Sequence, residues 1–238
     1  MTTAVIAASH GTSSADGQAA VRRLVEALGA ALADPVIGCH VDVEEPDVPT
    51  ALQAAAHVAD RAVIVPLLLS AGYHVYVDLA ESAEAAPLPS TVTGALGPDL
   101  RLVDALVRRL DEAGMRDADT VVLAAAGSSD ARAVTDCRTM GELLAARIGR
   151  PVTVGFISAA APRVPDAVRA ARAAHPGARV LIATYLLAPG YFAGLAEDAG
   201  ADLVTRPLLT PDSTPPELVE IIADLATASA PQASIASA

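Results

Sequence analysis

The chain has 238 residues, a formal net charge of −12 and only 3% aromatic residues. This composition argues against a nucleic-acid binder, because few cations neutralise phosphates and few rings stack on bases. Hydrophobic residues make up 53% of the sequence and charged residues 18%, which excludes a largely disordered protein.

The first six residues of the chain include no basic residue, so no signal peptide is indicated. No apolar run reaches the roughly 18 residues that a membrane-spanning helix needs. The two cysteines, Cys39 and Cys137, form no CxxC motif, so neither a disulfide framework nor a metal cluster is indicated. We therefore expect a soluble cytoplasmic protein that binds neither a membrane nor nucleic acid.

The first part of the chain alternates between short apolar segments and segments with apolar residues at helical spacing. We expect strands over residues 3–8, 36–43 and 62–69, and helices over residues 15–33, 49–59, 77–85 and 102–113. The third strand is apolar throughout, which is typical of a strand covered on both faces. Strands that alternate with helices predict an α/β fold with a parallel sheet and right-handed crossovers.

The second half of the chain repeats the first half. The distance from Gly11 to Gly127 is 116 residues, and so is the distance from Pro46 to Pro162. A Gly-Tyr pair then recurs at an offset of 118, which implies a two-residue insertion. We therefore expect two similar α/β units, over residues 1–116 and 117–228, with a boundary near residues 114–119. The Ala/Ser/Pro-rich tail, residues 229–238, is predicted to be disordered.

Polar side chains follow the three predicted strands of the first unit. His10 comes after the first strand, Asp42 lies at the end of the second, and His74 follows the third. Ligands of parallel sheets bind beyond the carboxyl ends of the strands, so these residues are expected to converge. The second unit has apolar or hydroxyl residues at the equivalent positions, Ala126, Ser158 and Phe192. This loss indicates one active unit and one scaffold unit.

Two imidazoles and one carboxylate are suitable ligands for a divalent borderline metal ion. A neutral imidazole is also a proton acceptor near neutral pH, so His10 and His74 have either role open to them. For His40 we favour a packing or surface role, and Glu44 is expected in a solvated turn. Asp78 lies four residues after His74, where it either orients that imidazole or stabilises a helix start.

With these residues, the sequence resembles the sirohydrochlorin chelatases, the class II tetrapyrrole chelatases of the CbiX/SirB type. The resemblance covers about residues 3–225 and rests on the order and spacing of several short motifs. These motifs are Ser-His-Gly-Thr at 9–12, Asp-Val-Glu-Glu-Pro at 42–46, Val-Pro-Leu-Leu-Leu at 65–69, Gly-Tyr-His at 72–74 with Asp78, and Gly-Ser-Ser-Asp at 127–130.

The resemblance implies two flavodoxin-like three-layer α/β domains and the insertion of a divalent metal ion into sirohydrochlorin. Fe²⁺ would give sirohaem, whereas Co²⁺ would lead toward cobalamin. His10 and His74 match the catalytic pair of the family, and Asp42 matches an acidic residue that is commonly glutamate. The chain has neither a histidine-rich tail nor a cysteine-bound cluster, which favours iron. No cofactor beyond the substrate metal is implied, and two units in one chain suggest a monomer.

Two other classes of protein use similar residues. A non-catalytic carrier of a metal or tetrapyrrole would need the same three side chains, but it would stop at one equivalent instead of turning over. A phosphatase or mutase of the phosphohistidine type also has a histidine after its first strand. That class needs Arg-His-Gly, whereas Ser9 precedes His10 in this chain, so it is disfavoured.

Overall fold

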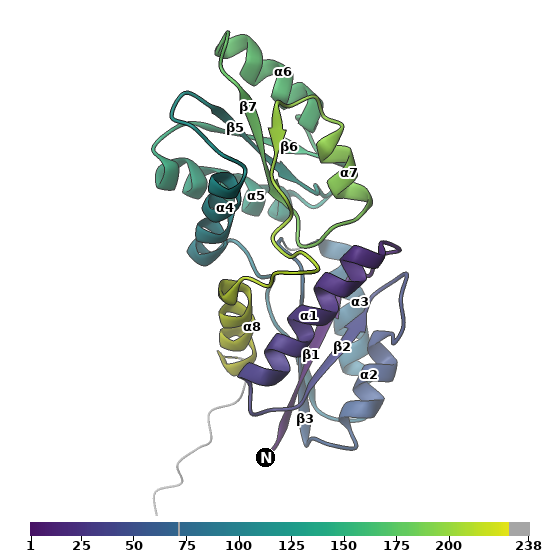
Figure 1. Ribbon diagram of the computed structural model, residues 1–238. Coiled ribbons are helices and arrows are strands. Elements are labelled where there is room, and N and C mark those ends of the chain that lie inside the picture. The colour runs from purple at the N-terminus through teal and green to yellow at the C-terminus, as the bar shows by residue number, and fades with distance from the viewer. Residues whose placement is uncertain (71, 229–238) are drawn as a thin grey trace, which may run out of the picture.

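The computed structural model describes residues 1–70 and 72–228, except for the side chains of residues 73–75. The tail predicted to be disordered, residues 229–238, lies outside the described residues. Two four-stranded parallel sheets form the centre, with strand orders β2-β1-β3-β4 and β6-β5-β7-β8. Helices flank both sheets, so the predicted α/β architecture of two similar halves is confirmed (Figure 1).

The strands are β1 (Thr3–Ser9), β2 (Val36–His40), β3 (Arg61–Pro66), β4 (Ser90–Val92), β5 (Thr120–Ala125), β6 (Val152–Phe156), β7 (Val180–Tyr185) and β8 (Leu203–Val204). The helices are α1 (Ala15–Ala31), α2 (Val48–Ala55), α3 (Tyr73–Glu84), α4 (Leu100–Glu112), α5 (Ala131–Ile148), α6 (Val164–Ala174), α7 (Tyr191–Glu197) and α8 (Pro216–Ala228). Among the described residues, no helix is long and apolar enough to cross a bilayer.

The central strands are buried on both faces because helices cover them from either side. All seven residues of β1 are buried, and Val5 pairs with Val36 on one side and with Val63 on the other. Some expectations for this sheet were wrong. Strands β2 and β3 end at His40 and Pro66, each three residues before its predicted end, and the short edge strand β4 was not predicted.

Helices α4 and α8 are exchanged between the two halves. Helix α4 follows the first sheet in the chain but packs on α5 and β7 of the second half, whereas α8 returns to pack on α1 and β3 (Figure 1). Arg108 of α4 and Glu217 of α8 join the two helices through bonds of 2.9 and 2.8 Å. A division of the chain near residue 116 therefore separates the two sheets but not their helices.

One apolar cluster runs through both halves and holds them together. It contains buried residues from both sheets and from the exchanged helices, among them Leu24, Leu69, Leu106, Leu123 and Ile222. Burial of large aliphatic side chains is the main stabilising contribution in such a fold. The position of one sheet relative to the other is therefore fixed by packing as well as by chain connections.

The internal repeat is visible in the backbone of two equivalent loops. In each half, the loop after the second strand donates an amide hydrogen bond to the loop after the first. Asp42 donates to the His10 carbonyl at 3.0 Å, and Ser158 donates to the Ala126 carbonyl at 2.8 Å. Positive φ angles recur at the same offset of 116 residues, at Gly11 (93°) and Gly127 (87°), and at Val43 (68°) and Ala159 (54°).

Candidate active site

The structure brings His10 and Asp42 to the same edge of the first sheet. His10 follows β1 directly and is exposed, so its imidazole is accessible to a ligand. The Asp42 amide donates to the His10 carbonyl, and the neighbouring Val41 amide donates to the Ser9 carbonyl at 2.8 Å. The Asp42 side chain is also exposed, and its carboxylate accepts a hydrogen bond from the Val43 amide at 2.8 Å. Two loops that carry predicted site residues are therefore joined through their backbones.

The third predicted residue, His74, belongs to the first turn of α3, which follows β3. Parallel strands end at the same edge of a sheet, so the backbone of α3 begins on the side of the sheet where β1 ends. The side chain of His74 lies outside the described residues. Asp78, one turn later, is exposed, and its backbone carbonyl accepts a bond from the Ser82 hydroxyl at 2.8 Å.

A chain of polar contacts lies beneath the loop that carries His10. The Ser9 hydroxyl and the Nδ1 atom of His40 share a hydrogen bond of 2.7 Å. The same Nδ1 atom lies 3.7 Å from Oε1 of Glu44, and this oxygen accepts a bond from the Thr12 amide at 2.8 Å. The contacts therefore connect the residues on both sides of His10 to the loop that carries Asp42.

The prediction of a solvated turn for Glu44 was wrong, because its side chain is only 15% exposed and holds the Thr12 amide. His40 is equally buried, and its ring contacts two polar groups, so it is more than a packing residue. The sequence carried one usable signal for this pair. His40 and Glu44 flank Asp42 symmetrically, and β2 neighbours β1, which places them beside the loop of residues 9–12.

Backbone of the second half lies beside this edge. The loop before α7 packs on the start of α1, where the Cα of Gly17 lies against the Pro189 carbonyl. A side chain at Gly190 would begin 3.2 Å from the hydroxyl of Thr12. Gly17 and Gly190 have no side chains, so the two halves approach closely here. The contact at Thr12 lies two residues after His10 in the sequence.

Of the predicted site residues His10, Asp42 and His74, only the first two have described side chains. Within the described part of the chain, no group of three or more His, Cys, Asp or Glu residues could hold a metal ion. The two cysteines are buried and unpaired. Burial and the nearby Asp47 raise the pKa of Cys39 to about 12, which keeps this thiol protonated at neutral pH.

The decisive comparison is with protein families. The model of the CbiX family matches residues 4–113 and 120–195, which together make up most of the chain. The chain belongs to the CbiX family. Both halves of this CbiX-family protein are covered, so the match includes the second half as well as the half that contains His10 and His74. Among curated proteins, none matches the sequence.

Solved structures similar to this CbiX-family chain agree in fold. SirB from Bacillus subtilis with Fe³⁺ has a TM-score of 0.82 at 21% identity, over 96% of this chain and 97% of that one. The sirohydrochlorin chelatase SirB from Bacillus subtilis subspecies spizizenii in complex with cobalt has a TM-score of 0.74 at 18% identity, over 95% and 94%. The multi-domain DR2241 from Deinococcus radiodurans has a TM-score of 0.66 at 20% identity, over 95% of this chain and 54% of that one.

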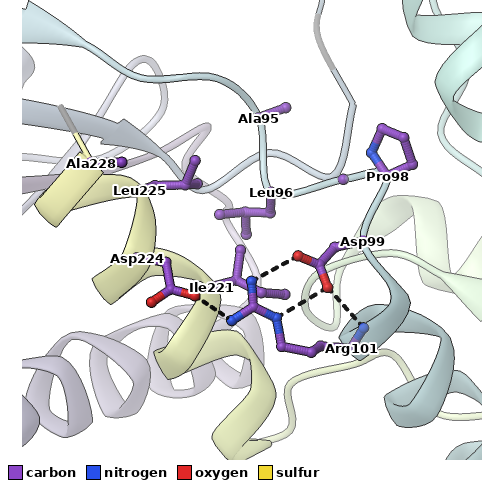
Figure 2. A pocket seen from close by; sticks show the side chains of 10 residues that line it. Ala95, Leu96, Pro98, Asp99, Arg101, Ile221, Asp224, Leu225 and Ala228 are labelled. Carbon is purple, nitrogen blue, oxygen red and sulfur yellow. Dashed lines mark hydrogen bonds and ion pairs between the residues drawn. The ribbon is translucent and has the colours of Figure 1, made fainter.

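A pocket of about 240 Å³ in this CbiX-family chain lies between α8, the start of α4 and the loop before it. Figure 2 shows Arg101 at its edge, between the carboxylates of Asp99 and Asp224. Hydrogen bonds that Arg101 donates to Asp99 and Asp224 raise the pKa of its guanidinium, whose charge is therefore already balanced. Leu96 and Ile221 give the pocket an apolar lining. None of the predicted site residues lines it.

Proposed function

We propose that this chain inserts a divalent metal ion into sirohydrochlorin, with Fe²⁺ favoured and Co²⁺ possible as the metal substrate. The observation that carries the proposal is the exposed His10, joined to Asp42 by a backbone hydrogen bond at the carboxyl edge of the sheet in a CbiX-family chain. Two solved proteins of the same fold are a SirB with Fe³⁺ and a sirohydrochlorin chelatase with cobalt, which supports this substrate class.

The reaction requires two proton transfers, because the free macrocycle carries two pyrrolic N–H protons that must leave before a metal ion binds. His10 and His74 are proposed to hold the metal ion or to accept these protons, since a neutral imidazole does both near neutral pH. Asp42 is proposed to balance the charge of the ion or to relay protons. Its exposed carboxylate is one methylene shorter than the glutamate common in the family.

The scaffold half is proposed to hold the macrocycle against the histidines. Its loop at Pro189 and Gly190 already packs on the start of α1, so it lies beside the loop that carries His10. No cofactor other than the metal substrate is needed for this chemistry. Because both halves are present in one chain, we propose that it works as a monomer, with sirohydrochlorin and the metal ion as its partners and the cytoplasm as its location.

The test is an anaerobic insertion assay with excess sirohydrochlorin and Fe²⁺, Co²⁺ or Ni²⁺, followed by absorption spectroscopy and corrected for uncatalysed insertion. His10→Ala and His74→Ala should each lower kcat by at least about 100-fold, as expected for the loss of a proton acceptor. Asp42→Asn should lower it less. The exposed His175 of the second half provides the control, and His175→Ala should retain full activity. Near-normal turnover in the His10 or His74 variant would contradict the assignment.

A non-catalytic carrier of metal or tetrapyrrole remains the second candidate, because it would use the same three residues. The same assay separates the two functions by stoichiometry. An enzyme converts many equivalents of sirohydrochlorin per chain, whereas a carrier stops at one. The preferred metal follows from the ratio of kcat/KM for Fe²⁺ and Co²⁺, because imidazole and carboxylate accept both ions.

A further inference from the structure

Tyr185 connects the second half to the first half by one buried hydrogen bond. It is the last residue of β7 and is only 2% exposed. Its hydroxyl donates to the backbone carbonyl of Leu69 at 2.8 Å. Burial raises the pKa of this phenol well above its ordinary value, so the hydroxyl stays protonated and remains a donor at any working pH.

Leu69 belongs to the segment that leads from β3 to His74. The first two residues of this segment are hydrogen-bonded within their own half. The Leu67 amide donates to the Ala8 carbonyl at 2.8 Å, and the Leu68 carbonyl accepts from the Leu96 amide at 2.8 Å. The next two contact the second half. Leu69 accepts from Tyr185, and the Ser70 side chain is hydrogen-bonded to the thiol of Cys137 in α5.

The start of α3 depends on this upstream segment. Its N-cap residue is Gly72, which has no side chain to hold the first amides of the helix. Among the described residues, a Cβ at Gly72 would also meet no atom within 4 Å. The contacts at Leu69 and Ser70 are therefore the last described side-chain restraints before the turn that contains His74.

Gly97 leaves room for the contact between Tyr185 and Leu69 because it has no side chain. A Cβ at Gly97 would overlap the hydroxyl of Tyr185 and would lie 2.6 Å from the carbonyl oxygen of Leu69. Any side chain at this position would push the two groups apart. The Gly-Pro-Asp motif at 97–99 therefore has a packing role at the junction of the two halves, in addition to starting α4 with Asp99 as its N-cap.

We propose that Tyr185 is a positioning residue for metal insertion, because its hydroxyl holds the segment of residues 67–70, which leads to the first turn of α3 with His74, against the scaffold half. The inference rests on the proposed function of His74. A hydrogen bond across the junction restrains the segment that leads to His74 against the macrocycle-holding half. Small misplacements of reacting groups cost about 100-fold in rate, which makes such a restraint useful.

The test compares Tyr185→Phe with Thr184→Val, a matched control at the adjacent residue. Thr184 is equally buried, and its hydroxyl donates to the Thr205 carbonyl at 2.7 Å, within the second half alone. Both variants lose one buried hydroxyl bond to a backbone carbonyl. Tyr185→Phe should lower kcat by about 10-fold to 100-fold with little change in KM for sirohydrochlorin. Thr184→Val should stay within about twofold of the original kcat under conditions where both are folded.

Hydrogen–deuterium exchange gives a second measurement that does not depend on activity. Amides of residues 69–76 should exchange faster in Tyr185→Phe than in Thr184→Val or the unaltered protein. Gly97→Ala should reproduce both effects if Tyr185→Phe does not fold. Equal kinetic losses in the two variants, or unchanged exchange in this segment, would overturn the proposal. If His74→Ala retains turnover, the proposed function fails, and the exchange data alone decide whether Tyr185 holds the segment.

Discussion

The backbone carbonyl of Asp42 lies directly against the Cα of Gly11, at the point where the loops of the two predicted site residues meet. A Cβ at Gly11 would overlap this carbonyl oxygen, and the φ angle of 93° is one that residues with side chains rarely adopt. Glycine is therefore required for His10 and Asp42 to belong to loops in backbone contact.

Gly11→Ala should reduce both stability and metal insertion. The strained φ angle alone costs about 1–3 kcal/mol, and the overlap adds to it by pushing the Asp42 loop away. The second half provides a matched control, because the Cα of Gly127 lies in the same way against the Ser158 carbonyl. Gly127→Ala should lower the free energy of unfolding by a similar amount but impair kcat less. Urea denaturation and the insertion assay measure the two effects, and equal activity losses would contradict this account.

Much of the fold follows from the sequence because it depends on local pattern. The buried strands β1 and β3 are continuous apolar runs, and the repeat of 116 residues predicts the second sheet from the first. The edge strand β4 escaped prediction because its residues, Ser90–Val92, are few and only partly buried. The predicted end of β2 came too late because Val41 and Val43 continue the alternation of apolar and polar residues. The backbone at Val43 has a φ of 68°, which does not fit an extended strand.

The exchange of α4 and α8 and the contacts of His40 could not be predicted, because both are tertiary. Apolar periodicity shows which face of α4 is buried but not which sheet covers it. In the same way, His40 and Glu44 looked like residues of a strand end and a turn. Their burial arises because β2 lies beside β1, which brings Ser9 and Thr12 within hydrogen-bonding distance. The sheet edge of the candidate site was predictable, whereas the contacts that support it were not.

Glu44→Ala should lower metal insertion without unfolding the protein. The carboxylate of Glu44 holds the Thr12 amide at 2.8 Å, two residues after His10, so its removal should loosen the loop that carries the imidazole. We expect a decrease in kcat of about 10-fold, smaller than for removal of His10 itself. Glu45 is the control, because its side chain is exposed and accepts a hydrogen bond from the Asp47 amide, two residues away, instead of from the loop that carries His10. Similar losses for Glu44→Ala and Glu45→Ala would indicate a charge effect instead of a positioning effect.

Asp119 should make stability depend on pH in acid. Hydrogen bonds of 2.9 and 2.6 Å from Arg179 hold the pKa of this buried carboxyl below its ordinary value of 3.8. A lowered pKa in the folded state contributes stability above the ordinary value, and this contribution is lost as the pH falls through the folded-state pKa. Asp119→Asn should therefore lower Tm by several degrees at neutral pH, and the difference from the unaltered protein should shrink below about pH 4.

The control for Asp119 is Asp166, whose carboxylate pairs with Arg169 on the exposed surface of α6. Exposed ion pairs contribute little, so Asp166→Asn should leave Tm unchanged at every pH. Thermal denaturation followed by circular dichroism over a series of pH values gives the comparison. A constant difference in Tm between Asp119→Asn and the unaltered protein down to the acid limit would show that the carboxylate does not act through its ionisation.

Tyr76→Phe should have the opposite effect on stability to Tyr185→Phe, although both remove one phenolic oxygen. The Tyr76 hydroxyl is buried without a hydrogen-bond partner among the described residues, whereas that of Tyr185 donates to Leu69. Burial and the charge of Asp136 raise the pKa of Tyr76 to about 12, so the phenol stays neutral. Removing an unsatisfied buried group should stabilise the fold by up to about 1–3 kcal/mol, and removing the paired one should destabilise it by a similar amount. Urea denaturation of the two variants measures both signs. A loss of stability in Tyr76→Phe would mean that this hydroxyl has a partner in solution, such as an ordered water molecule.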